Sequence, residues 1–254
     1  MHVIVTGASS GIGEALVREY VKAGAAVTLV ARRLELLRKL AAEVGGRTHV
    51  IAADLGDPVG GTAWLADAEA ALGPCDVLIN NAGVQIVGAA ADTDPDQGEA
   101  LLRLNVHSPM RLTVKVLPGM LARRSGTIVD VASVAALTPT PGMFYYNASK
   151  AALAAASESL RHELRGTGVR VVTVYPGPVH TAMGDAGARA YQPSAALSLT
   201  PWGTTEALAV LIRRAVEKGR PRVIYPRSYA VSRRLPNLSR WLVGRFAPRL
   251  KKGE

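Results

Sequence analysis

Short runs of apolar, mostly β-branched residues alternate along the chain with longer stretches in which apolar residues recur every three or four positions. The short runs predict strands at residues 3–6, 26–31, 48–53, 76–80, 127–131, 170–175 and 222–225. The longer stretches predict helices at residues 12–23, 34–44, 64–72, 110–121, 148–164 and 205–216. Several strands are apolar on both faces, as in a parallel sheet covered by helices. The pattern predicts an α/β fold with a doubly wound, mostly parallel seven-stranded sheet in a single domain.

Two segments near the C-terminus depart from this alternation. Residues 178–201 have no clear period and are rich in Ala, Gly, Pro, Ser and Thr. Two interpretations of this segment stay open, a mobile substrate loop or a surface connection with one short helix. Residues 228–254 follow the last predicted strand. We therefore divide the chain into a domain of residues 1–227 and a C-terminal extension of residues 228–254.

The composition is that of a globular protein. Of the 254 residues, 48% are apolar and 20% are charged, which excludes disordered, collagen-like and coiled-coil classes. The longest apolar stretches have fewer than ten residues, so we expect no transmembrane helix. The chain shows no secretory signal, and the single Cys75 excludes an intramolecular disulfide and a cysteine-based zinc site. We expect a cytoplasmic location, and the five scattered histidines indicate no metal site.

The formal net charge of +10 is concentrated at the C-terminal end. Residues 1–212 contain 17 basic and 18 acidic side chains, whereas residues 213–254 contain 13 basic and 2 acidic ones. This distribution indicates a neutral globular domain with a basic extension. Because no aromatic-basic motif or recognition helix accompanies the charge, we expect no binding to nucleic acid.

The extension has the pattern of a basic amphipathic helix. Its apolar residues recur at steps of three and four, at Leu235, Leu238, Leu242, Phe246 and Leu250, and its basic residues are Arg234, Arg240, Arg245, Arg249, Lys251 and Lys252. Pro236 suits a helix start, whereas Gly244 and Pro248 are expected to weaken or break the later turns. Three uses stay open: peripheral contact with an anionic membrane, a lid over a lipophilic substrate or a neighbouring subunit, and a short helix packed on its own domain.

A glycine-rich turn follows the first predicted strand. It reads Thr6-Gly7-Ala8-Ser9-Ser10-Gly11-Ile12-Gly13, and a helical pattern begins at once. Glycines in this position let the backbone approach a pyrophosphate at the positive end of the helix. A tight strand-to-helix turn explains one glycine but not three glycines with a Thr and two Ser. The segment therefore predicts a dinucleotide site.

Two arginines at the end of the second predicted strand indicate which dinucleotide binds. About 25 residues after Gly7, where an NAD site places a carboxylate for the ribose 2′-hydroxyl, the chain has Arg32 and Arg33. Guanidinium groups hold a 2′-phosphate by bidentate hydrogen bonds. A pair of solvated arginines is the alternative, but cations at the start of a helix oppose its dipole. We predict NADP(H) as the cofactor.

Tyr146 and Lys150 stand four residues apart and share one face of a predicted helix. A nearby ammonium favours the phenolate, so we expect the pKa of Tyr146 to lie below its usual value. Ser133 ends a strand at the edge where open α/β sheets bind ligands, and its hydroxyl is placed to steady an oxyanion. Taken alone, a Tyr and a Lys at this spacing are more often a pair on a helix surface.

These features together resemble the short-chain dehydrogenase/reductase family over roughly residues 3–226. Six of them occur in the family's order: Thr6 to Gly13, Asp54-Leu55, Asn80-Asn81-Ala82-Gly83, Asn105, Ser133 with Tyr146 and Lys150, and Pro176-Gly177 with Thr181. They are the TGxxxGxG and YxxxK motifs of one subgroup and their usual companions. Two positions depart from the family, Val134 after Ser133 and Asn147 after Tyr146, and neither removes a catalytic group.

The resemblance implies a Rossmann-like fold and a role for each matched residue. Tyr146 is then the general acid/base, Ser133 polarises the substrate carbonyl, and Lys150 holds the nicotinamide ribose and tunes Tyr146. Asn105 completes a proton relay through water. The implied cofactor contacts are Gly7, Ser9, Ser10, Gly11, Ile12 and Gly13 at the pyrophosphate, Asp54 and Leu55 at the adenine, Asn81, Ala82 and Gly83 behind the cofactor, and Pro176, Gly177 and Thr181 at the nicotinamide.

We therefore expect an NADP(H)-dependent oxidoreductase that acts on a carbonyl or secondary alcohol of a small molecule. Residues 1–227 form its dinucleotide-binding catalytic domain. The apolar residues of 178–201 favour an apolar substrate, and Tyr145, beside Tyr146, is expected to pack or to line the substrate pocket. A non-catalytic NADP(H)-binding regulator is the alternative, since one fold serves many functions. The resemblance also favours a homodimer or homotetramer, for which the alanines of 151–156 offer a smooth helix face.

Overall fold

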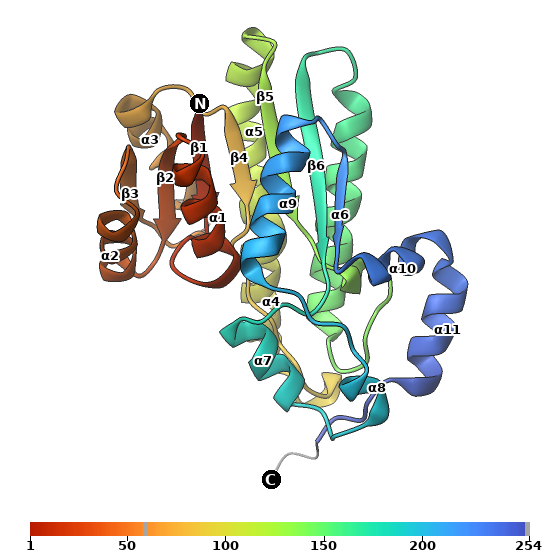
Figure 1. Cartoon of the computed structure of the whole chain (residues 1–254). Coiled ribbons are helices and arrows are strands. Elements are labelled where there is room, and N and C mark those ends of the chain that lie inside the picture. Colours follow the sequence, from red (N-terminus) through yellow and green to blue (C-terminus); the bar gives the residue numbers. More distant parts are fainter. Residues whose placement is uncertain (58–59, 252–254) are drawn as a thin grey trace.

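The computed structural model describes residues 1–57 and 60–251 and confirms the predicted α/β fold (Figure 1). Seven parallel strands form one sheet in the order β3-β2-β1-β4-β5-β6-β7. They are β1 (His2–Thr6), β2 (Ala26–Ala31), β3 (Thr48–Ala52), β4 (Val77–Asn80), β5 (Gly126–Val131), β6 (Val169–Pro176) and β7 (Arg222–Tyr225). The strand order reverses between β1 and β4, and open sheets of this kind bind ligands at the carboxyl ends of such strands.

Helices cover both faces of the sheet (Figure 1). They are α1 (Gly11–Lys22), α2 (Leu34–Val44), α3 (Leu65–Leu72), α4 (Pro95–Leu102), α5 (Ser108–Ala122), α6 (Phe144–Glu163), α7 (Ala182–Arg189), α8 (Ala195–Ser198), α9 (Thr205–Glu217), α10 (Ala230–Arg234) and α11 (Pro236–Phe246). Alternate residues of β1 show the two layers, because Val3 and Val5 pack with α1, α2 and α9, while Ile4 packs with α3 and α5. Both faces of the strand are therefore apolar.

The predicted strands and helices are found within a few residues of their expected ends, and the unassigned stretches contain further helices. The helix α4 was not predicted, although Asp94 accepts a hydrogen bond from the amide of Asp96 (3.0 Å) and Pro95 occupies the first turn, a recognisable helix start. Residues 178–201 contain two helices, α7 and α8, so the expectation of a single short helix is wrong. The Thr181 hydroxyl begins α7 by accepting a hydrogen bond from the amide of Gly184.

The C-terminal extension packs against the segment after α7. The amide of Gln192 donates to the carbonyl of Arg249 (2.8 Å), and the amide of Lys251 donates to the carbonyl of Ala190 (2.9 Å). Helix α11 begins at Pro236 and ends before Pro248, as predicted. The helix nevertheless continues through Gly244, which lies on its solvent-exposed side. Lys252 lies outside the described residues. Within residues 1–57 and 60–251, no helix is long and apolar enough to cross a membrane.

Candidate active site

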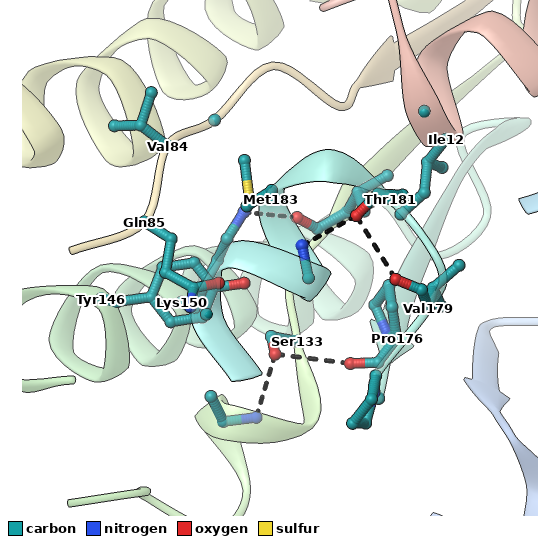
Figure 2. Close-up of a pocket in the computed structure, with 18 of the residues that line it drawn as sticks. Ile12, Val84, Gln85, Ser133, Tyr146, Lys150, Pro176, Val179, Thr181 and Met183 are labelled. Carbon is teal, nitrogen blue, oxygen red and sulfur yellow. Dashed lines mark hydrogen bonds between the residues drawn. The ribbon is translucent and has the colours of Figure 1, made fainter. Parts of the chain in front are cut away.

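A cavity of about 1100 Å³ lies at the carboxyl ends of the strands and brings most of the predicted site residues together. Its lining includes Gly7, Ser9, Ser10, Gly11, Ile12, Arg32, Arg33, Asp54, Leu55, Asn81, Ala82, Gly83, Ser133, Tyr146, Lys150, Pro176, Gly177 and Thr181. Figure 2 shows Ser133, Tyr146 and Lys150 in this cavity together with Thr181 and Met183. Gly13 and Asn105 do not line the cavity, but each contacts a residue that does, Gly7 and Val84 respectively.

The three glycines of the first turn are packed too closely against neighbouring atoms to carry a side chain without strain. Gly7 and Gly11 have positive φ angles of 66° and 59°, which other residues rarely adopt. A Cβ on Gly7 would lie 2.8 Å from Cα of Ala82, and a Cβ on Gly13 would clash with the carbonyl of Gly7. The side chain of Ser10, the residue before α1, makes no capping hydrogen bond. The N-terminal amides of α1 therefore face a cradle that suits a pyrophosphate.

Hydrogen bonds tie this turn to the end of β4. The Thr6 hydroxyl accepts from the backbone amides of Asn81 (3.0 Å) and Ala82 (3.1 Å) and donates to the carbonyl of Ile79 (3.1 Å). The Asn81 side-chain amide donates in turn to the carbonyl of Thr6 (2.9 Å). The two strand ends at the switch point of the sheet are thus held in one arrangement.

Arg33 reaches back over the glycine turn. Its guanidinium donates to the hydroxyls of Ser9 (2.9 Å) and Ser10 (3.1 Å). Arg32 lines the same part of the cavity, and both arginine side chains are exposed. Asp54 lies on the same lining and accepts a hydrogen bond from the amide of Gly56 (2.9 Å), which fixes its carboxylate. This end of the cavity combines two cations with the hydroxyls of the glycine turn.

Asn105 is fully buried in a π-helical turn, Arg103–His107, between α4 and α5. Its side-chain amide donates to the carbonyl of Val84 (2.9 Å) and to the Ser149 hydroxyl (3.1 Å), and its oxygen accepts from the amide of Val84 (2.9 Å). A Cβ on Gly83 would lie 3.0 Å from that oxygen. The Asn105 side chain thus holds the wall formed by residues 83 and 84 and does not line the cavity.

Ser133, two residues after the end of β5, and Tyr146 of α6 both face the cavity. The Ser133 hydroxyl donates to the carbonyl of Pro176 (3.4 Å) and accepts from the amide of Ala135 (3.1 Å), as the dashed lines in Figure 2 mark. Burial raises the pKa of Tyr146, and a hydrogen bond with the Ser133 side chain acts in the opposite direction. At neutral pH the phenol therefore keeps its proton and is able to donate it.

Lys150 lies one helical turn after Tyr146 on α6. Its ammonium donates to the carbonyl of Val131 (2.9 Å) and lies 5.8 Å from the centre of the Tyr146 ring. Burial lowers the pKa of Lys150 to about 8, while the carboxylate of Asp130 favours its charged form. The expectation that this ammonium holds the pKa of Tyr146 below its usual value is wrong in this structure. Its nitrogen is directed at a backbone carbonyl, and desolvation of the phenol dominates.

The far end of the cavity is apolar and is built by segments that the sequence motifs did not identify. Residues 183–202 contribute Met183, Tyr191, Leu197, Leu199 and Trp202, and α11 contributes Leu242, Val243 and Phe246. Gln85 and Thr140 are among its few polar members. Asn147, the residue that departs from the family pattern, holds the backbone of Thr140 with its side chain. Its amide nitrogen donates to the Thr140 carbonyl (2.8 Å), and its oxygen accepts from the Thr140 amide (3.3 Å). No motif marks these residues because their shared position depends on long-range packing.

Tyr145 does not line this cavity. Its ring packs on α4, where a Cβ on Gly98 would run into the ring, and it meets the Phe144 ring edge-on at 5.3 Å. Of its two expected roles, the structure therefore shows the packing role. Among the described residues, no group of three or more His, Cys, Asp or Glu side chains is placed to hold a metal ion.

Comparison with known proteins identifies relatives of this chain. The family model of the short chain dehydrogenases matches residues 1–191. A short chain dehydrogenase from Pseudocercospora fijiensis is 40% identical over 186 residues, which are 71% of this chain and 60% of that protein. The chain therefore matches less than two thirds of the length of this relative.

Solved structures are similar over nearly the whole chain. A short-chain dehydrogenase from Streptomyces avermitilis is 33% identical, with a TM-score of 0.82 over 96% of this chain and 95% of that chain. A short-chain dehydrogenase/reductase from Burkholderia phymatum, solved in complex with NAD, is 24% identical, with a TM-score of 0.84 over 100% of this chain and 98% of that chain. The second likeness concerns the fold alone, and it extends through α10 and α11.

Proposed function

Because the chain belongs to the short-chain dehydrogenase/reductase family, whose members are oxidoreductases with a nicotinamide cofactor, we propose that it transfers hydride between NADP(H) and a carbonyl or secondary alcohol of an apolar small molecule. One observation carries the proposal: Ser133, Tyr146 and Lys150 line the same cavity as the glycine turn, and that cavity continues into an apolar end. A non-catalytic regulator of the same fold would not require Ser133, Tyr146 and Lys150 to lie in one cavity with both the glycine turn and an apolar end.

We assign the cofactor's pyrophosphate to the cradle at α1, because close packing keeps the turn at Gly7, Gly11 and Gly13 free of side chains beside the N-terminal amides of the helix. We assign the walls at 81–83 and 176–181 to its nicotinamide half and Asp54 with Leu55 to its adenine. The bound nicotinamide supplies the hydride to the substrate carbon or accepts it. We propose residues 1–227 as the catalytic domain and residues 228–254 as a C-terminal extension, of which Leu242, Val243 and Phe246 line the apolar end of the cavity.

Tyr146 is proposed to donate its phenolic proton to the carbonyl oxygen during reduction, and the raised pKa of the buried phenol keeps that proton in place. The Ser133 hydroxyl donates a hydrogen bond to the same oxygen as negative charge develops on it. Lys150 binds the nicotinamide ribose and supplies positive charge beneath Tyr146. Asn105 positions the wall at Val84 through two hydrogen bonds, contacts the Ser149 hydroxyl through a third, and is proposed to complete a proton relay through water.

NADP(H) is proposed over NAD(H) because of the two arginines at the end of β2. Arg33 already spans the hydroxyls of Ser9 and Ser10, and Arg32 lines the same surface. A 2′-phosphate there would accept charged hydrogen bonds that an unmodified ribose does not offer. The site provides two cations for that phosphate.

Replacing Arg32 and Arg33 together by Gln is expected to lower the NADPH-over-NADH affinity ratio by about 10- to 100-fold, since each charged hydrogen bond to phosphate is lost. Titration of both cofactors by fluorescence or calorimetry measures the ratio. Arg38→Gln is the control, because Arg38 lies on α2, the helix that follows the two arginines, pairs with Glu35 (3.0 Å) and does not line the cavity. Equal affinity of the unmodified protein for the two cofactors would contradict the assignment.

The apolar end of the cavity predicts the substrate preference. In a series of straight-chain ketones, kcat/KM is expected to rise by about fourfold for each added methylene until the cavity is filled. Val243→Asp should remove most of this increase in kcat/KM by raising the KM of the longer ketones. It should leave the kcat/KM of the shortest ketone nearly unchanged, because Val243 lines the apolar end of the cavity. Steady-state NADPH oxidation measures both. A flat series in the unmodified protein would contradict an apolar substrate.

We also propose a homodimer or homotetramer in the cytoplasm, in line with the family. Helices α5 and α6 expose apolar side chains, with Val114 68% and Phe144 64% exposed. Ala151, Ala152 and Ala155 are exposed beside them, so this part of the alanine-rich segment presents a smooth face, whereas Ala154 packs inward. Close contact between such helices would cover this face.

A further inference from the structure

Helix α11 and the residue before it, Leu235, carry an exposed apolar stripe. Leu235, Leu238, Trp241, Leu242 and Phe246 are 52%, 46%, 62%, 41% and 54% exposed. We call these five residues the α11 stripe. Steps of three and four along a helix place their side chains on neighbouring positions of one side. The inward positions are taken by Ser239, which is 5% exposed, and by Val243. The helix therefore exposes Leu238 and Trp241 to solvent, while the partly exposed Leu242 and Phe246 also line the cavity.

The segment that carries the stripe is basic. Residues 228–251 contain six basic side chains and no acidic one. The guanidinium of Arg233 is occupied by Glu158 (3.2 Å). Five exposed cations remain, and none of them has an acidic partner among the described residues: Arg234, Arg240, Arg245, Arg249 and Lys251. The guanidinium of Arg245 lies 5.4 Å from the centre of the Phe246 ring, inside the stripe.

This combination restricts what can cover the stripe. A second copy seated face to face would bring five cations against five cations, which is unfavourable. A nucleic acid would engage the cations and leave the apolar side chains in water. An anionic bilayer satisfies both, because its head groups pair with arginine and lysine while Trp, Phe and Leu enter the interface. We propose that α11 docks on an anionic membrane surface.

The mouth of the active-site cavity adjoins this surface. Leu242 and Phe246 belong to the stripe and also line the cavity, and so does Leu199 of the neighbouring segment, which is 81% exposed. In Figure 1 the end of α11 lies beside α8, at the side of the molecule where the chain ends. Docking through the stripe thus places the apolar end of the cavity against the bilayer. Resting on the proposed function, the inference names the substrate class: a lipophilic carbonyl compound dissolved in the membrane.

Sedimentation of the full-length protein, loaded with NADPH, with phosphatidylcholine vesicles that contain or lack phosphatidylserine tests the docking. We expect binding to the anionic vesicles alone, and loss of this binding in high salt. Arg240→Gln with Arg245→Gln should lower the partition coefficient by about 25-fold, at about fivefold for each cation. Leu238→Ser with Trp241→Ser should lower it by at least about tenfold. Neither Leu238 nor Trp241 lines the cavity.

A pair on α2 provides the matched control. Leu36→Ser with Lys39→Gln removes an apolar side chain that is 39% exposed and a neighbouring exposed cation, far from the stripe, and should leave vesicle binding unchanged. Protein that stays in the supernatant with anionic vesicles at low salt would overturn the docking proposal. A dimer that dissociates on Trp241→Ser would overturn it as well, since a second copy would then cover the stripe.

Turnover separates this inference from the proposed function. The Leu238→Ser, Trp241→Ser protein should reduce a water-soluble ketone at the normal rate but lose at least about tenfold of its rate on a long-chain ketone embedded in anionic vesicles. Equal rates on the embedded ketone would contradict delivery from the membrane. If the unmodified protein reduces no ketone at all, the proposed function is contradicted, whatever the result of the vesicle sedimentation.

Discussion

Replacing Tyr146 by Phe is expected to lower the turnover of a ketone by at least ~10²-fold and to leave NADPH affinity within about twofold. The phenol faces the cavity, and its raised pKa keeps the proton that the carbonyl oxygen must receive. Phe retains the ring and its packing but has no proton to donate. Single-turnover measurements with bound NADPH isolate this step from cofactor binding.

Tyr145→Phe is the matched control for this result. Tyr145 is the preceding residue on the same helix, and its ring packs on Gly98 outside the cavity. We expect its turnover to stay close to that of the unmodified protein. A Tyr146→Phe protein with unchanged turnover would exclude the phenol as the proton donor.

Gly13→Ala is expected to weaken NADPH binding by about 10- to 100-fold and to lower the melting temperature by several degrees. The added Cβ would meet the carbonyl of Gly7 and lie 2.7 Å from the side-chain nitrogen of Asn81. Both neighbours belong to the rigid junction of β1, α1 and β4, so the glycine turn has to move away from the pyrophosphate. Calorimetric titration and thermal unfolding measure the two effects.

Gly88→Ala serves as the control, because a Cβ at Gly88 meets nothing within 4 Å. It should bind NADPH normally. If Gly13→Ala bound NADPH as tightly as Gly88→Ala, the cradle at α1 would not be the pyrophosphate site.

The core of the fold could be predicted because its signals are local. The run Val3 to Val5 is apolar on both faces, and it lies in β1, which has a neighbouring strand on each side and helices on both faces. The glycine turn could also be located, because strand, turn and helix follow one another in the sequence, although a Cβ on Gly7 or Gly11 would meet the distant residues Ala82 and Thr181. These predictions depend on the spacing of apolar residues and on the order of elements that are adjacent in the sequence.

Other features depend on contacts between distant segments. Thr140, Tyr191 and Val243 meet in one cavity although a hundred residues separate the first from the last. The tail is fastened by backbone hydrogen bonds between residues 190–192 and 249–251, which no side-chain pattern marks. The pKa of Tyr146 was misjudged because spacing on a helix reveals proximity to Lys150 but reveals neither the depth of burial nor the carbonyl of Val131 that holds the ammonium.

The fate of the hydride tests the account most directly. The protein is incubated with NADPH that carries deuterium at the transferring position of the nicotinamide and with a long-chain ketone, and the alcohol is analysed by mass spectrometry. The account predicts deuterium on the carbinol carbon, formed by the unmodified protein and the Tyr145→Phe control at similar rates and at least ~10²-fold more slowly by Tyr146→Phe. Bound NADPH without any deuterated alcohol, across short and long ketones, would contradict it.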